Sequence, residues 1–126
     1  MKKIIFTDKA PAPIGPYSQA VLSGNTLYTS GQIALHPHTG ELVTGDIETE
    51  TRQVMENMKA VLEEAGMGFE NVVKATIFIS DMNDFANINA VYGNYFNEKT
   101  APARETVQVA KLPKNVNVEI SMIAVL

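Results

Sequence analysis

The chain has 126 residues, 45% of them hydrophobic, and a formal net charge of −4. This length predicts one compact domain over residues 1–126, and the acidic balance argues against nucleic-acid binding, which needs a broad basic surface. The absence of cysteine excludes disulfides, a thiolate nucleophile and a cysteine metal site. The start has too few apolar residues for a signal peptide, and no later stretch approaches a membrane span, so we expect a cytoplasmic protein.

The first part of the chain predicts three short strands, at residues 2–7, 19–22 and 26–29, with Gly24-Asn25 as a hairpin turn. The proline-rich segment 10–17 between the first two strands is a rigid surface connector, or it fixes Tyr17 at the edge of a pocket.

Ser30 and Gly31 end the third strand. A glycine there allows a bulge, which is the favoured interpretation, or lets the backbone approach a ligand closely. The two histidines in the following turn, His36 and His38, are separated by a proline and lack a nearby carboxylate pair, so we expect an exposed loop and no metal.

Residues 46–65 predict a helix, because apolar residues recur at spacings of three and four. The buried stripe comprises Ile47, Val54, Met55, Met58, Val61, Leu62 and Ala65. Gly45-Asp46 suits the start of the helix and Gly66 its end. Arg52 falls on the solvated face and is predicted to be a surface ion-pair residue.

A strand is predicted at residues 72–80, with Val73 on the same face as Ala75, Ile77 and Ile79. A second helix is predicted at about 82–98, with an inward stripe of Phe85, Ile88, Tyr92, Tyr95 and Phe96. Asn89 lies at helical spacing from this stripe and should point into an apolar seam. A buried amide needs partners, so Asn89 either bonds a neighbouring backbone, which is the favoured interpretation, or contacts a ligand.

The segment 100–109, TAPARETVQV, predicts a strand that begins after a proline. Strand alternation puts Arg104, Thr106 and Gln108 on one side and Glu105 on the other. A guanidinium beside a hydroxyl could receive a small carboxylate, because an arginine fork binds a carboxylate in two places.

Residues 116–126 predict the last strand. Its even positions are uniformly apolar and mark the face under the helices, whereas its odd face runs from Asn117 and Glu119 to Ile123 and Val125. If nothing covered this face of the sheet, Ile123 and Val125 would be exposed to water. We therefore expect a second subunit to cover them, with Glu119 at the edge of the interface. The order of elements predicts an α+β domain with two helices on one face of a mixed sheet.

Several segments resemble the reactive intermediate deaminase family, RidA or YjgF. They are IGPYSQA (14–20), TSGQI (29–33), VVKATIFISDMNDFANINAVY (72–92), APARETVQV (101–109) and KLPKNVNVEISMIA (111–124). The resemblance runs nearly end to end. It implies a chorismate-mutase-like fold, a homotrimer with clefts between subunits, and cofactor-free hydrolysis of 2-imino acids, released by pyridoxal-phosphate dehydratases acting on threonine or serine, to 2-keto acids and ammonia.

The resemblance also implies roles for particular residues. Arg104 would bind the substrate carboxylate, and Glu119 would position or activate the attacking water. The cleft would be lined by Tyr17, Ser30, Gly31 and Asn89, with Thr106 beside the substrate.

Two positions depart from the family pattern. Many members have a cysteine where Thr106 stands, and a small residue where Glu105 stands; an added carboxylate near an anion site could weaken binding or alter selectivity. The alternative function is a non-catalytic protein that binds 2-keto acids or similar small carboxylates. RNA cleavage, attributed to relatives, is disfavoured by the acidic balance and by the lack of a paired catalytic histidine.

Overall fold

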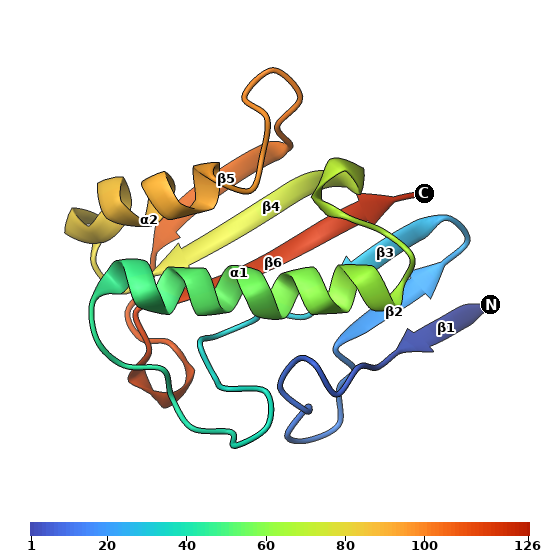
Figure 1. Cartoon of the computed structure of the whole chain (residues 1–126), viewed down its shortest axis with the longest axis horizontal. Helices are drawn as coiled ribbons and strands as arrows, with labels where there is room; N and C mark the ends of the chain where they lie inside the picture. The colour runs from blue at the N-terminus through green and yellow to red at the C-terminus, as the bar shows by residue number, and fades with distance from the viewer.

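The computed structural model describes all of residues 1–126. Six strands form one sheet in the order β1-β2-β3-β6-β4-β5, and both helices lie on the same face of it (Figure 1). The strands are β1 (Lys2–Ile5), β2 (Ala20–Ser23), β3 (Thr26–Thr29), β4 (Val72–Ile79), β5 (Ala103–Gln108) and β6 (Val118–Val125). Strand β5 runs parallel to β4 and all other neighbours are antiparallel. The prediction of a mixed sheet with two helices on one face is confirmed.

Helix α1 (Ile47–Glu64) agrees closely with its prediction. Asp46 caps its start by accepting a hydrogen bond from the Thr49 amide at 2.7 Å, and Gly66 follows its end with a φ of 74°. Arg52 is exposed as expected, but the ion-pair prediction is wrong: the one ion pair of the chain joins Lys74 and Glu105.

Helix α2 (Phe85–Gly93) is shorter than predicted. Residues Met82–Asp84 form a 3-10 turn with Asp81 as its cap, and the helix ends at Gly93, where the low helix propensity of glycine and asparagine favours a turn. Tyr95 and Phe96 nevertheless pack inward, with ring centroids 5.2 Å and 5.3 Å from that of Phe69.

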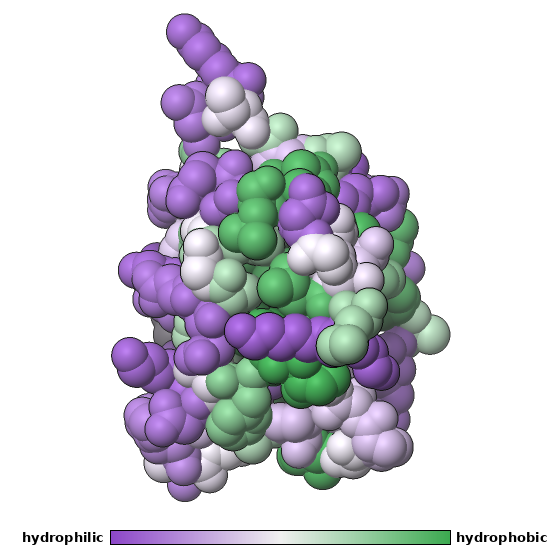
Figure 2. Space-filling view, turned by 90° about the vertical axis from the view of Figure 1, so that its right-hand side faces the viewer, coloured by the Kyte–Doolittle hydropathy of each residue, from purple (hydrophilic) through white to green (hydrophobic).

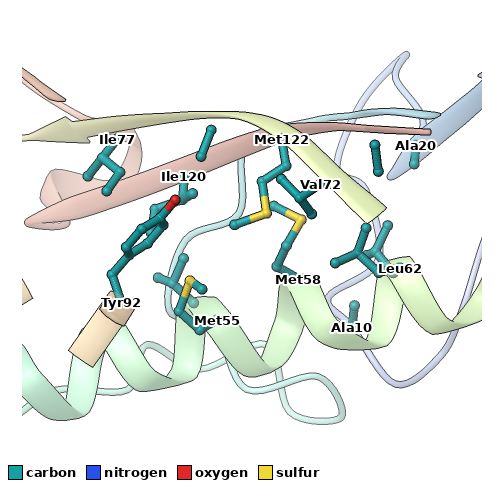
Figure 3. Close-up of a cluster of buried hydrophobic side chains, with 14 of the residues drawn as sticks. Ala10, Ala20, Met55, Met58, Leu62, Val72, Ile77, Tyr92, Ile120 and Met122 are labelled. Atoms are coloured by element: carbon teal, nitrogen blue, oxygen red, sulfur yellow. The ribbon is translucent and has the colours of Figure 1, made fainter. Parts of the chain in front are cut away.

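The core lies between the helices and the sheet (Figure 3). Helix α1 contributes Met55, Met58 and Leu62, and the sheet contributes alternate residues of β4 and β6, among them Ile77, Ile120 and Met122. The even positions of β6 are buried as predicted.

Strand β4 departs from simple alternation at its start. A bulge at Val73 puts Val72 and Lys74 opposite consecutive residues of β6, Ala124 and Ile123. Val72 therefore joins the buried face and Val73 is 50% exposed, so the prediction that Val73 shares a face with Ala75, Ile77 and Ile79 is wrong.

The other face of the sheet has no covering layer within the chain. Tyr28 and Val107 lie on it, 51% and 40% exposed, and Ile123 is half-buried. Apolar side chains also reach the surface on the side of the molecule where both termini lie, as Figure 2 shows. The distribution is compatible with the prediction of a covering subunit, which stays a prediction.

Candidate active site

Arg104 lies on β5 and faces α2. It pairs with Ala75 of β4, and side chains of directly paired residues share one face of a sheet, so the guanidinium lies on the helix-covered face. Its Nη1 donates a hydrogen bond to Asn89 Oδ1 at 2.6 Å, and its Cζ lies 5.0 Å from the ring centroid of Tyr92 and 5.6 Å from that of Phe85. No carboxylate of the chain pairs with it.

Thr106 and Asn89 lie beside Arg104 on the same side of the sheet. Thr106 shares the face of Arg104, and its hydroxyl is buried without a hydrogen-bond partner. Asn89 is exposed, so the prediction of an amide buried in an apolar seam is wrong. The reason is that α2 crosses near the sheet edge formed by β5, where Asn89 meets the arginine and not the core.

Glu119 belongs to the opposite face of the sheet. It pairs with Phe78 of β4, which alternates with the buried Ile77 and Ile79. The side chain is half-buried, and this burial raises the pKa of the Glu119 carboxyl above its usual value of 4.5. Gly31 lies against it so closely that a Cβ at Gly31 would overlap the carboxylate. Any side chain at Gly31 would therefore displace the Glu119 carboxylate from this position.

Residues 29–31 form a bulge beside Glu119. Tyr28 pairs with Ile123 and Gln32 bridges to Ile120, so three residues on this side oppose two on β6. Ser30 is held away from β6, since its amide donates to Gln19 O at 2.9 Å and its hydroxyl to Ser18 O at 2.6 Å. The Gly31 amide takes no part in backbone hydrogen bonding, which leaves a donor beside the carboxylate. The predicted bulge is confirmed, and the alternative interpretation, a close approach of the backbone to a ligand, stays a prediction.

The proline-rich segment is anchored by Gln19. The Gln19 side chain is 2% exposed; it accepts from the Thr7 amide at 2.8 Å and donates to Thr7 O at 3.0 Å and Pro11 O at 2.9 Å. The anchored segment carries Tyr17, whose hydroxyl accepts a weak hydrogen bond from the Ile14 amide at 3.3 Å. Tyr17, Ser30, Gly31 and Glu119 line one cavity of about 500 Å³.

The seven predicted site residues therefore form two groups. Arg104 and Asn89 line a different cavity, of about 400 Å³, on the helix-covered face. The chain brings Arg104, Asn89 and Thr106 together, and separately gathers Tyr17, Ser30, Gly31 and Glu119, but the sheet separates the two groups. A single chain thus presents two half-sites on opposite faces.

Sequence reasoning missed three features of these half-sites. Phe85 and Tyr92 were assigned to the core alone; their helical spacing around Asn89 was visible in the sequence, but their contact with Arg104 depends on where α2 crosses the sheet. Lys114 lines the Glu119 cavity and, like Asn115, has a positive φ, 55° and 56° respectively. Asparagine adopts a positive φ more readily than most residues, but no sequence pattern predicts this conformation, or a place in the cavity, for Lys114.

Two further observations bear on the kind of site. His36 and His38 are exposed, and no three His, Cys, Asp or Glu side chains lie close enough together to hold a metal ion. No helix has the length and apolar character needed to cross a membrane.

The fold is that of a chorismate-mutase-like α+β protein, and solved structures match it over the full chain. A structure described as a putative endoribonuclease from Thermotoga maritima has a TM-score of 0.97 and 52% identity, covering 100% of this chain and 98% of that one. The structure of Escherichia coli TdcF with bound serine has a TM-score of 0.92 and 48% identity, covering 98% of each chain.

Sequence comparison leads to the same family. The family model described as Endoribonuclease L-PSP matches residues 7–126. The 2-iminobutanoate/2-iminopropanoate deaminase of Escherichia coli (strain K12) is 50% identical over 127 residues, covering 99% of this chain and 98% of that protein. Other similar relatives carry the name RutC family protein. The chain belongs to the RidA/YjgF/RutC family, as the sequence resemblance predicted.

Proposed function

We propose that this protein hydrolyses 2-imino acids, and the enamines from which they form, to 2-keto acids and ammonia. The observation that carries the proposal is the Arg104 guanidinium, which is held by Asn89 and has no carboxylate partner in its own chain. An arginine fork in this state is suited to a substrate carboxylate. The deaminase relative at 50% identity supplies the reaction class.

The proposed reaction uses a water molecule and both half-sites. Arg104 binds the carboxylate, and Glu119 accepts a proton from water as the water oxygen attacks C2 of the imine. The substrate reacts as its protonated imine, so this attack gives a neutral carbinolamine. Its nitrogen takes the proton back from Glu119, the C–N bond breaks as the hydroxyl gives its proton to the Glu119 carboxylate, and ammonia leaves with the 2-keto acid. Glu119 has a raised pKa, which suits a group that both accepts and returns a proton. No cofactor takes part in these steps.

The remaining residues of the half-sites are proposed to bind the substrate. The free Gly31 amide and Ser30 would contact the polar atoms around C2, Tyr17 would close the cavity, and Thr106 would lie beside the arginine. Because Arg104 and Glu119 lie on opposite faces of one chain, we propose that the site forms between subunits of a homotrimer, with one half from each neighbour.

The test couples a threonine dehydratase to this protein and follows the appearance of 2-ketobutyrate. Wild-type protein should accelerate it, and Arg104→Ala should lose about 3 kcal/mol of transition-state stabilisation, because the substrate loses its charged anchor. Arg52→Ala is the matched control, since it removes the other arginine of the chain from an exposed helix position. Wild type no faster than buffer would refute the proposal.

A second candidate is a binding protein for small carboxylates without turnover. It is favoured by the relative TdcF, whose structure holds bound serine, an amino acid and not an imine. The Glu119→Gln variant separates the two functions, because it keeps Arg104 and removes the proton acceptor. If the protein is a hydrolase, Glu119→Gln should keep the wild-type affinity for 2-ketobutyrate and lose turnover. If it is a binding protein, wild type and variant should both bind 2-ketobutyrate and neither should show turnover.

Cleavage of RNA, which the family description names, has less support in this chain. The net charge is −4 and the half-sites contain no histidine, whereas RNA binding needs basic and aromatic surfaces.

A further inference from the structure

Three side chains of one helix hold the Arg104 guanidinium. Phe85, Asn89 and Tyr92 are spaced by four and three residues, so they share one face of α2. Asn89 accepts a hydrogen bond from Nη1 at 2.6 Å, and the two rings lie 5.6 Å and 5.0 Å from Cζ. The Tyr92 ring is the nearer of the two and is only 5% exposed.

The hydrogen bond to Asn89 alone cannot fix the arginine. It restrains one nitrogen of an exposed side chain that has large rotamer freedom and no ion pair. An aromatic face within about 6 Å of a guanidinium attracts it and favours a defined stacking geometry. The orientation of the fork therefore depends on the rings as well as on the amide.

The hydroxyl of Tyr92 does not contribute to this contact. It is buried without a hydrogen-bond partner and lies toward the core near Ile120, as Figure 3 shows. Burial raises the pKa of Tyr92 to about 12, while the positive charge of Arg104 acts in the opposite direction, so the phenol is neutral at physiological pH. The interaction with Arg104 thus comes from the ring face and not from an ion pair.

We propose that Tyr92 is a positioning residue whose ring face sets the orientation in which Arg104 receives a carboxylate. The consequence for binding rests on the proposed function of Arg104, but the ring contact can be measured without any ligand.

The first measurement uses the fact that Arg52 and Arg104 are the only arginines of the chain. Their side-chain Nε–Hε groups give two NMR signals, which the Arg104→Lys variant assigns. A ring face shifts a stacked proton upfield, so the Arg104 signal should lie upfield of the Arg52 signal. It should move part of the way toward the Arg52 position in Tyr92→Leu, because the Phe85 ring 5.6 Å away remains, and it should return in Tyr92→Phe, which restores the second ring. An Arg104 signal unchanged by Tyr92→Leu would overturn the proposal.

The second measurement compares the affinities of 2-ketobutyrate and of its primary amide by calorimetry. Tyr92→Leu should weaken the carboxylate ligand about tenfold and the amide much less, and Tyr92→Phe should restore the affinity. Leu62→Ala destabilises the same core from α1 without touching Arg104, and should leave both affinities unchanged. An equal loss of affinity for both ligands in Tyr92→Leu, or a similar loss of affinity in Leu62→Ala, would show that Tyr92 acts only through the stability of the fold. A wild type that binds neither ligand would refute the proposed function, and the NMR signals would still decide the ring contact.

Discussion

Arg104 and Glu119 are prepared for different tasks by their surroundings. Arg104 is stacked against rings and bonded to an amide, which leaves its charge unopposed. Glu119 is half-buried beside Gly31, where burial makes its charged form less favourable. Glu105, the departure noted in the sequence, points to the open face and pairs with Lys74 at 3.2 Å. It therefore cannot compete for Arg104 within its own chain.

Gly31→Ala should separate activity from stability. The added Cβ would overlap the end of the flexible Glu119 side chain, which can swing away at little cost to the fold. We expect the activity to fall at least about tenfold while the free energy of unfolding changes by less than about 1 kcal/mol. Turnover assays and urea unfolding check the two quantities, and an active Gly31→Ala would contradict the assigned position of the carboxylate.

The raised pKa of Glu119 predicts opposite trends of stability and activity with pH. The folded state holds the proton more tightly than the unfolded state, whose pKa is near 4.5, so its stabilising contribution is complete below pH 4.5 and is lost as pH rises through the folded pKa. Activity needs the carboxylate and should rise over the same interval.

The measurement compares wild type with Glu119→Gln. The free energy of unfolding of wild type should fall relative to that of the variant as pH increases above 4.5, by an amount reduced by solvent because Glu119 is only half-buried. A difference that is constant with pH, or that grows in favour of wild type, would contradict the cause assigned to the shift.

At the scale of elements, the proline-rich segment before β2 and the bulge after β3 form the Glu119 half-site around β6. The bulge at residues 29–31 turns backbone toward Glu119, and Gln19 fixes the proline-rich segment above it. On the other face, the short helix α2 places Asn89, Phe85 and Tyr92 on one edge strand. Each half-site thus depends on one loop or helix packed against one strand.

Gln19→Leu tests the anchor of the proline-rich segment. The leucine would leave the Thr7 amide and three carbonyl oxygens, those of Thr7, Ala10 and Pro11, without their partner, so we expect a loss of about 2–4 kcal/mol in the free energy of unfolding. Hydrogen exchange should also increase at residues 7–17. Glu63→Gln, on the exposed face of α1, is the control and should change neither quantity. Unchanged exchange in Gln19→Leu would show that the prolines alone hold the segment.

The sequence predicted the elements well where hydrophobic periodicity agrees with the residues that start and end a helix or strand. Asp46 and Gly66 bracket α1, and the alternation of β6 identified its buried face. It failed where one residue changes the pattern: the bulge at Val73 reverses the face of Val72, and Gly93 ends α2 early. The contact between Asn89 and Arg104 could not be predicted from the local sequence pattern, because it depends on where α2 crosses the sheet.

At the scale of the whole molecule, the sheet separates the residues that the proposed reaction must combine. Arg104 and Thr106 share one face with the buried core residues, while Glu119 shares the other with Tyr28 and Ile123. A helix layer covers the first face and nothing within the chain covers the second. The seven candidate residues were therefore identified from the sequence, but their division between two faces became apparent only in the structure.

The proposed function requires an active site shared by two chains, and subunit mixing tests this directly. Arg104→Ala and Glu119→Gln should each be inactive alone, because each lacks one half of every site. After equal amounts are unfolded and refolded together, about one quarter of the sites in any cyclic oligomer combine an intact Arg104 with an intact neighbouring Glu119. The mixture should recover about one quarter of wild-type activity. No recovery in mixed oligomers, verified by mass spectrometry of tagged subunits, would contradict a site shared between chains.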